Sequence, residues 1–154
     1  MKLKNFLLIA IFGMFIVSCK QKQSLKEYMA QSWETTYLKI EMATYEKSDS
    51  LYVYEKEFNE NSAQVAQSKY NSDGTFSAWF ADKNGGKFSH VDGKWSAEND
   101  SLFVHFIYND VTTNVSYHIT QTDEGFLGKS KSDWDKDGDF DDLLTMRTKR
   151  IKEE

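Results

Sequence analysis

The densest charge in the sequence lies near its C-terminal end, at positions 133–142. These ten residues read Asp-Trp-Asp-Lys-Asp-Gly-Asp-Phe-Asp-Asp, with six carboxylates and one lysine. Carboxylates at alternate positions can direct their oxygens toward one point when a glycine, in this case Gly138, allows a sharp turn between them. Because Ca²⁺ binds about six to eight oxygen ligands, the spacing points to a calcium-binding loop.

The spacing follows the first half of an EF-hand loop, with glycine at the sixth position. The predicted ligands are Asp133, Asp135, Asp137, Asp139 and Asp141. In that pattern Asp139 binds through its backbone carbonyl, and Asp141 binds directly or through a water. The twelfth position is Leu144 where the pattern has glutamate, so Asp142 or a distant residue must supply the bidentate ligand. No helix pair flanks the segment, so we expect a loop between two strands that calcium would stiffen.

The alternative is an acidic loop that is simply exposed to water. Like charges at this density repel one another, and open solvation relieves the repulsion as a bound cation would. Four basic residues on neighbouring predicted strands would partly balance the charge: Lys129, Lys131, Arg147 and Lys149. The sequence leaves both interpretations open.

The only cysteine, Cys19, stands at the end of an apolar run near the N-terminus. Lys2 and Lys4 precede twelve apolar residues at positions 6–17. This run is too short for a transmembrane helix, which needs roughly 20 apolar residues, but it fits the hydrophobic region of a secretory signal. With one cysteine the chain forms no internal disulfide, so an attachment point is the simplest role for this thiol.

The four residues that end the run, Ile16-Val17-Ser18-Cys19, resemble the lipobox of bacterial lipoprotein signal peptides. The resemblance implies that the Cys19 thiol takes a diacylglyceryl group and that a peptidase cuts before it, after the small Ser18. An ordinary signal peptide or a buried apolar strand is the alternative. We therefore expect a signal peptide at 1–18, the lipidated cysteine and its tether at 19–24, and one folded domain at 25–154.

The mature chain would be acidic. Removing Lys2 and Lys4 from the 19 basic residues leaves 17 against 24 acidic ones, a net charge of −7. This charge argues against a nucleic-acid partner and against a basic face on the membrane. Aromatic residues make up 15% of the chain and it has no proline, a composition typical of a folded, strand-rich domain rather than of a disordered tail.

From residue 33 onward, apolar and polar residues alternate between turn signals, which predicts short antiparallel strands. Two hairpins, which turn at 71–74 and at 109–110, are supported by register. In the first, the predicted apolar or small pairs are Tyr70–Phe76, Ser68–Ala78 and Ala66–Phe80. In the second, they are Tyr108–Val111, Phe106–Thr113, Val104–Val115 and Leu102–Tyr117.

Further strands are predicted near 33–43, 87–97, 125–132 and 143–151. With the four hairpin strands the total is about eight, and the mostly short links favour an all-β, up-and-down antiparallel barrel. The segment 44–63 is the exception, because it is long and charged. It is either a loop folded over one end of the barrel or it holds a short extra strand near Leu51–Tyr54.

A short helix is predicted at 24–31, where Ser24 and Glu27 have the spacing of a capping box, and it leads into a strand that begins with Trp33. The segments that follow include Tyr-Asn-Ser-Asp-Gly-Thr-Phe at 70–76, Gly-Lys-Trp-Ser at 93–96 and Asp-Ser-Leu at 100–102. Over about residues 25–150 this order resembles the small lipocalin-like lipoproteins of Gram-negative bacteria. The chain departs from the lipocalin Gly-x-Trp signature, because position 31 is Gln31. The resemblance implies a calycin-type barrel with a non-enzymatic binding role, and it names no ligand.

A barrel of about eight strands is either filled by side chains or holds one small ligand. The residues predicted to line such a cavity are Tyr70, Ala78, Phe80, Trp95, Phe106 and Tyr117. Small residues such as Ala78 would leave space for an apolar ligand. The alternative is a fully packed core in which small residues face large ones.

The leading hypothesis is a membrane-anchored, lipocalin-like lipoprotein of the cell envelope, at the outer membrane and facing the periplasm. It would bind a small apolar ligand or serve as an envelope accessory protein. The alternative is a structural or protein-interaction module with a dry barrel and a calcium-stiffened acidic loop. We expect no enzymatic activity, because His90, His105 and His118 lie on separate segments and no Gly-x-Ser-x-Gly or His-Glu-x-x-His motif occurs.

Overall fold

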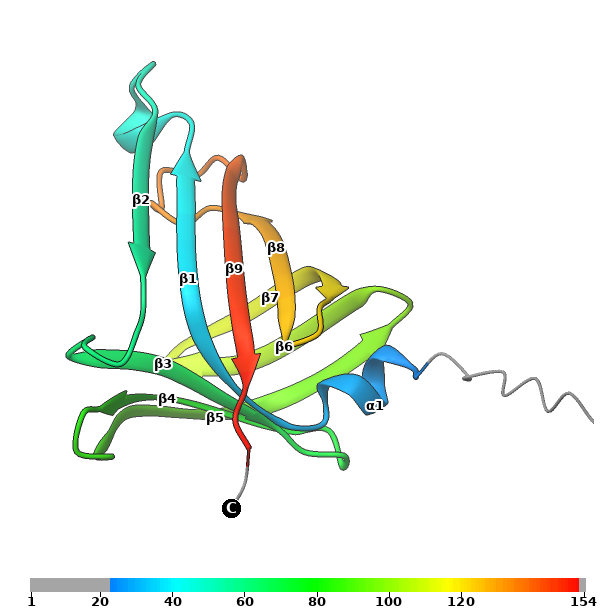
Figure 1. Cartoon of the computed structure of the whole chain (residues 1–154). Helices are drawn as coiled ribbons and strands as arrows, with labels where there is room; N and C mark the ends of the chain where they lie inside the picture. Colours follow the sequence, from blue (N-terminus) through cyan, green and yellow to red (C-terminus); the bar gives the residue numbers. More distant parts are fainter. Residues whose placement is uncertain (1–22, 153–154) are drawn as a thin grey trace, which may run out of the picture.

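Alternating apolar and polar residues form nine strands within residues 23–152, the part of the chain that the computed structural model describes (Figure 1). In chain order the elements are α1 (Leu25–Met29), β1 (Ser32–Met42), the 3-10 helix η1 (Tyr45–Lys47), β2 (Tyr52–Glu57), β3 (Gln64–Tyr70), β4 (Thr75–Asp82), β5 (Lys87–Glu98), β6 (Ser101–Tyr108), β7 (Val111–Gln121), β8 (Phe126–Ser132) and β9 (Asp142–Arg150). The predicted helix and the four strands predicted by residue range are confirmed, with ends that differ by at most two residues. The predicted signal peptide and Cys19 lie outside the described residues.

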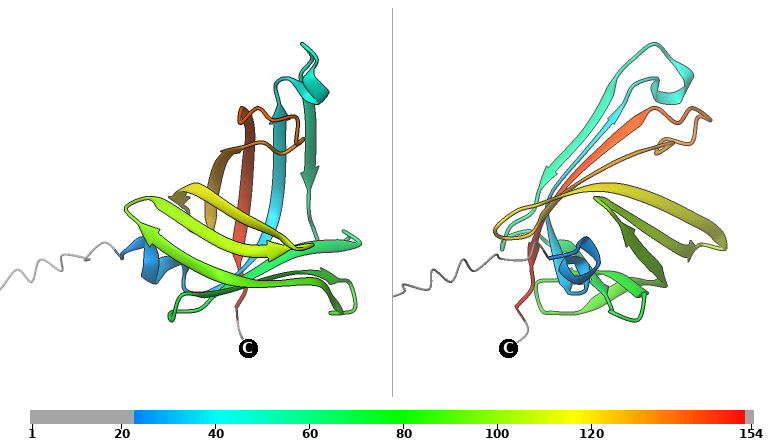
Figure 2. Two further views of the ribbon diagram at one scale, coloured as in Figure 1. Left: turned by 180° about the vertical axis from the view of Figure 1, so that it is seen from behind. Right: turned by 90° about the vertical axis from the view of Figure 1, so that its right-hand side faces the viewer.

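Eight of the strands close into a barrel. Consecutive strands from β3 to β9 are hydrogen-bonded neighbours, and β1 joins the two ends by pairing with β9 on one edge and with β3 on the other. Every pairing is antiparallel, and Figure 2 shows β1, β8 and β9 forming one curved wall that faces β3, β4 and β5. The predicted all-β, eight-stranded antiparallel barrel is therefore confirmed.

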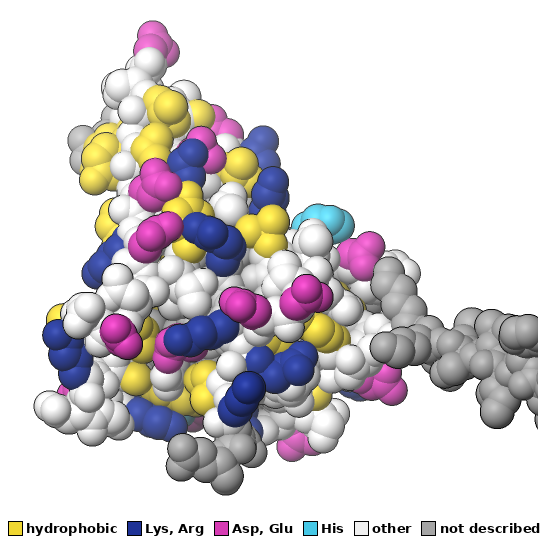
Figure 3. Space-filling view, in the orientation of Figure 1, with side chains coloured by type: hydrophobic (Ala, Val, Ile, Leu, Met, Phe, Trp, Pro, Cys, Tyr) yellow, Lys and Arg dark blue, Asp and Glu magenta, His cyan; other side chains and the backbone are white. Residues whose placement is uncertain are grey.

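The strand β2 is additional to the closed barrel. It pairs with Tyr37–Met42 of β1, while β3 pairs with Ser32–Glu34 farther along the same edge. Segment 44–63 thus contains a strand, which confirms the second of the two sequence alternatives. Its aromatic and β-branched residues favour extended backbone, and they stay partly exposed: Figure 3 shows hydrophobic side chains on the surface along this strand, where Tyr52 is 47% exposed.

Both predicted hairpins form with the predicted register. In the first, Tyr70 faces Phe76. Gly74 closes the turn with a φ of +85°, a backbone conformation that is unfavourable for residues with a Cβ atom. In the second, Asn109 and Asp110 both have positive φ, at 48° and 62°. Two consecutive positive φ values fit the two-residue turn that matches the right-handed twist of the strands it joins.

Helix α1 fills one end of the barrel. Its capping box forms as predicted, because Glu27 N donates to Ser24 Oγ at 3.3 Å and Ser24 N donates to Glu27 Oε2 at 3.1 Å. The helix buries Met29 beside Trp33, whose Nε1 donates to the Met29 carbonyl at 3.0 Å. No helix within residues 23–152 is both long and apolar enough to cross a membrane.

Candidate functional site

The inner face of the barrel can be followed from strand register, because residues that alternate along a strand and their cross-strand partners share one face. On β4 this face carries Phe76, which lies in the core, then Ala78 and Phe80. Across the sheet Ala78 pairs with Val91 of β5, and Phe80 pairs with Phe88. The same face therefore continues from the packed core toward the end of the barrel that α1 leaves open.

A hollow of about 270 Å³ lies on this inner face, against strands β3 to β6. The inward-facing side chains that line it are Ala66, Ala78, Phe80, Val91, Phe106 and Tyr108. Ala66 and Ala78 lie on adjacent strands, and their short side chains leave the space that larger residues would fill. Phe80 is 38% exposed and Tyr108 51%, so aromatic rings surround an open mouth.

The facing wall of the barrel is also apolar toward its open end. Leu144 of β9 is buried and pairs with Ile40 of β1, which in turn pairs with Tyr54 of β2. Next to these, Met42 pairs with Tyr52. Since cross-strand partners share a face, β2 extends this wall with two tyrosines beyond the closed part of the barrel.

The six residues predicted to line a cavity are divided between two environments. Ala78, Phe80 and Phe106 line the hollow. Tyr70 and Trp95 belong to the packed core at the helix end, where their ring centroids lie 5.4 Å apart and the Trp95 Nε1 donates to the Asn71 carbonyl at 2.8 Å. The sequence thus allowed both a cavity and a filled core, and the barrel has each at a different end.

Tyr117 of β7 packs against the core cluster and pairs with the fully buried Leu102 of β6. Burial raises the pKa of the Tyr117 phenol to about 12, and burial together with the nearby Tyr117 also raises the pKa of Tyr70. Desolvation has this effect because a phenolate loses more hydration than a phenol does. The two phenols thus belong to the packed part of the interior, in the cluster that also contains Tyr28 and Met29 of α1.

Three of the inward-facing lining residues were not among the six predicted from the sequence: Ala66, Val91 and Tyr108. Tyr108 continues the alternation of Phe106 by one step, and Val91 stands four residues before Trp95 on the same face of β5. The periodic signal was therefore present. The alternation does not indicate which end of the barrel α1 fills, and therefore which inward-facing residues line an open space.

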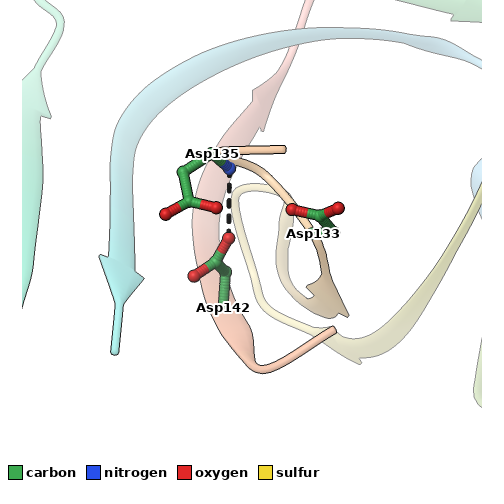
Figure 4. A group of neighbouring side chains, drawn as sticks. All are labelled: Asp133, Asp135 and Asp142. Atoms are coloured by element: carbon green, nitrogen blue, oxygen red, sulfur yellow. Dashed lines mark hydrogen bonds between the residues drawn. The ribbon is translucent and has the colours of Figure 1, made fainter. Parts of the chain in front are cut away.

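The acidic loop between β8 and β9 brings together three carboxylates, from Asp133, Asp135 and Asp142 (Figure 4). One oxygen of each lies within 4.8 Å of the others. Asp142 is only 1% exposed, and its Oδ2 accepts hydrogen bonds from Trp134 N at 2.6 Å and from Asp135 N at 3.2 Å. Asp142 thus lies beside two of the five predicted ligands, Asp133 and Asp135.

The remaining predicted ligands are arranged differently. Asp137 and Asp141 share a neighbour, since the Thr44 hydroxyl lies 3.4 Å from an oxygen of Asp137 and 3.5 Å from one of Asp141. Asp139 is exposed and is not part of the three-carboxylate group. Gly138, with a φ of +101°, makes the sharp turn that was predicted and donates its N–H to Asp133 Oδ2 at 3.2 Å.

Two of the basic residues expected to balance this loop pair elsewhere. Arg147 lies 3.4 Å from a Glu57 oxygen, and Lys149 lies 2.9 Å from a Glu34 oxygen. The expectation was wrong for these two because β9 pairs with β1 along most of its length, so their outward side chains reach acidic residues on β1 and β2.

Two of the three histidines are bonded away from the hollow. His90 Nε2 lies 2.9 Å from Asp92, and His105 Nδ1 lies 2.7 Å from the Asn114 side-chain oxygen. Both rings are on exposed residues of the strands. Neither residue lines the hollow or joins the carboxylate group.

Comparisons of the chain with models of protein families, with curated proteins and with solved structures found no match. The geometry alone therefore classifies the fold. The described residues form a closed, eight-stranded antiparallel β-barrel with one extra strand, which is consistent with a lipocalin-like, calycin-type architecture.

Proposed function

We propose that this protein is a non-enzymatic binding protein whose barrel holds a small apolar molecule at its open end. The observation that carries the proposal is the hollow lined by Ala66, Ala78, Val91 and Phe106 with aromatic residues at its mouth. Exposure of apolar walls of this kind to water is unfavourable unless a bound molecule covers them. Binding pockets for small molecules are also lined mostly by apolar and aromatic side chains.

The size of the hollow limits the ligand. Its volume of about 270 Å³ lies just under the range of roughly 300–1,000 Å³ typical of small-molecule sites. Because Tyr70 and Trp95 fill the interior below it, the ligand cannot descend to the helix end. A compact apolar molecule, or one short arm of a larger one, fits these limits.

The site of action in the proposal is the bacterial cell envelope, with the barrel tethered through lipid on Cys19. The support for this part is the lipobox-like sequence that ends at Cys19. A diacyl or triacyl anchor holds a protein stably, whereas a single acyl chain does not. The described barrel begins within a few residues of this cysteine, so the tether would be short.

Native mass spectrometry of the full chain, purified from its own host, tests the binding proposal. We expect a retained apolar molecule of low mass on the wild-type protein. Ala78→Phe should lose it, because the larger ring fills the hollow. Ser77→Phe is the matched control, since the same ring on the neighbouring residue of β4 points to the opposite face and bound ligand should remain. A wild-type protein that carries nothing, or two variants that behave alike, would overturn the proposal.

A second candidate function is favoured by the position of Asp142. We propose that the acidic loop binds Ca²⁺ through Asp133, Asp135 and Asp142, and that the ion stiffens the connection between β8 and β9. The support is that a nearly fully buried carboxylate stands beside two others within 4.8 Å. In this alternative the barrel serves as a structural or protein-interaction module, and the loop rather than the hollow is its functional part.

A further inference from the structure

Strand β2 is paired along one edge and open along the other. It is hydrogen-bonded to β1 and stands at the end of the strand order, so no strand within residues 23–152 pairs with its second edge. All six of its residues are exposed. Figure 1 shows β2 at the outer margin of the wall that β1 and β9 form. An open edge of this kind is a template for pairing with another strand.

The devices that usually keep an edge strand from pairing are weak in β2. The chain contains no proline, and the register of β1 with β2 runs through six consecutive residue pairs without a bulge. Its two carboxylates are already bonded within the chain. The Tyr37 hydroxyl donates to Glu55 at 2.7 Å, and Arg147 lies 3.4 Å from an oxygen of Glu57. Their charge therefore repels an approaching strand less than bare carboxylates would.

The hydrogen-bond pattern identifies the backbone groups that face the open edge. Phe58 N donates to the Thr36 carbonyl at 2.9 Å, one position beyond the last residue pair of β1 and β2. In an antiparallel pair every second residue points its N–H and C=O toward the neighbouring strand. Counted back from Phe58, the residues that face β1 in this way are Lys56, Tyr54 and Tyr52. The backbone groups on the open edge are therefore those of Val53, Glu55 and Glu57.

Two copies of this edge are self-complementary in one antiparallel register. Residues that point outward must face residues that point outward, which restricts the register to steps of two. When Tyr54 faces the Tyr54 of a second copy, Val53 faces Glu55 and Tyr52 faces Lys56. No like charges are then directly opposite, and the Lys56 ammonium lies within reach of the second copy's Tyr52 ring.

The two neighbouring registers are less favourable. One step in one direction brings Glu55 opposite the Glu55 of the second copy. One step in the other direction brings Asp49 opposite Glu57. Directly opposed like charges destabilise a strand pair. The charge pattern of the strand therefore favours the register that is centred on Tyr54.

We propose that β2 pairs with the β2 of a second copy of this chain, antiparallel and centred on Tyr54. Val53 of each copy would exchange both backbone hydrogen bonds with Glu55 of the other. Because both copies use the same edge, the interface is isologous and closes at two copies. Antiparallel pairing directs the two helix ends away from each other, so lipid tethers on both copies would hold the dimer lengthwise along a membrane.

The dimer would also cover part of the apolar wall at the open end of the barrel. Tyr52 pairs with Met42 and Tyr54 pairs with Ile40, so the two tyrosines lie on the inner face. Pairing of two β2 strands brings the two Tyr54 rings together on this face. A single strand pair buries less than the roughly 1,600 Å² of a standard interface, so we expect a weak dimer. The proposal is independent of what the hollow binds.

Disulfide cross-linking tests the register. Cys19 is the only cysteine, so a full chain with Cys19→Ser accepts one new cysteine at a chosen position. In maltoside micelles under mild oxidation, Tyr54→Cys should form a disulfide-linked dimer. The reason is that facing Cα atoms of a pair without hydrogen bonds lie about 4.5 Å apart, within the range that a disulfide spans.

Tyr52→Cys is the matched control for this cross-link. In the proposed register its two copies are four residues out of step, too far apart for a disulfide. Tyr52 is also the more exposed residue, at 47% against 38% for Tyr54, so random collisions would favour the control. Preferential cross-linking at Tyr54 supports the register, and equal cross-linking at both positions or at neither would overturn the proposal.

A proline at Val53 tests the backbone pairing. Val53→Pro removes an N–H on the open edge and leaves the bonds to β1 in place. It should weaken dimerisation by about tenfold, because one hydrogen bond is lost on each side of the twofold axis. Val53→Thr keeps the N–H and the β-branched shape, and it should associate like the wild type. Association is measured by sedimentation equilibrium of the full chain in density-matched micelles at about 100 µM, a concentration suited to a weak interface.

Three results would refute the dimer: a monomeric wild type, equal association of Val53→Pro and Val53→Thr, or species larger than two copies. The last would contradict an interface that closes on itself. A thermal melt shows whether Val53→Pro is folded, and the two cysteine variants decide the question if it is not. Loss of ligand in Ala78→Phe is read separately, so failure of the binding proposal and failure of the dimer are distinguishable.

Discussion

We expect the phenols of Tyr70 and Tyr117, in the packed interior, to make the stability of the barrel sensitive to alkaline pH. Burial raises the pKa of Tyr117 to about 12, whereas an unfolded tyrosine ionises near pH 10. A phenol whose pKa is raised on folding contributes stability that is fully present below about pH 10 and is lost as the pH rises toward 12. Tyr70 shifts in the same direction for the same reason, so the two effects have the same sign.

The size of the effect follows from the shift. At about pH 11 an unfolded Tyr117 is mostly ionised, whereas the folded phenol is mostly neutral. This difference lowers the free energy of unfolding by about 1 kcal/mol. This is an upper value, because Tyr117 is half-buried rather than fully enclosed and solvent screens part of the effect. The comparison is urea unfolding of the wild type and of Tyr117→Phe at about pH 9 and at about pH 11.

We expect Tyr117→Phe to lose less stability than the wild type between these two pH values, by up to about 1 kcal/mol. Tyr52→Phe is the matched control and should lose as much as the wild type, because that ring is 47% exposed. Equal losses for the wild type and Tyr117→Phe would refute the reasoning, because they would show that folding does not raise the pKa of Tyr117.

Three further predictions concern the anchor, the loop and the helix. Cys19→Ser should move the protein from the membrane fraction to the soluble fraction without changing its melting temperature, and a variant that stays with the membrane would refute lipidation. Adding about 10 mM Ca²⁺ should stabilise the wild type by about 1–3 kcal/mol for a dissociation constant of roughly 10⁻⁴–10⁻³ M. Asp142→Asn should lose most of this gain and Asp139→Asn should keep it, as read from thermal melts; an unshifted wild-type melt excludes the calcium site. Tyr28→Phe should lower the free energy of unfolding by about 1–2 kcal/mol, because the one hydroxyl proton of Tyr28 is shared between two carbonyl oxygens, that of Thr122, at 3.0 Å, and that of Gly125. Unchanged urea unfolding would show that these bonds do not hold α1 on the barrel.

Much of the fold could be predicted from local patterns. The pairs Tyr70–Phe76 and Leu102–Tyr117 follow from alternation on each side of a short turn, and both occur in the barrel. A hairpin needs few residues to specify its register, because a slip of one position would turn every apolar side chain outward. The capping box of Ser24 and Glu27 is equally local and also formed as predicted.

The pairings of β1 are different, because they join residues far apart in the chain. Trp33 pairs with Arg150 on one edge and with Ser68 on the other. Neither partner can be identified from the residues around Trp33, since closure depends on the twist and number of all the strands between them.

The candidate sites show the same division. The sequence by itself determined that residues 133–142 form a turn of closely spaced carboxylates and that Ala78, Phe80 and Phe106 share an inward face, because alternation and glycine placement are local properties. Only the tertiary structure decided that α1 fills the end of the barrel around Trp95 and leaves the other end open, and that Asp142 is the carboxylate buried beside Asp133. These outcomes depend on which distant segments pack together, and burial and electrostatic environment are properties of that packing rather than of any one segment.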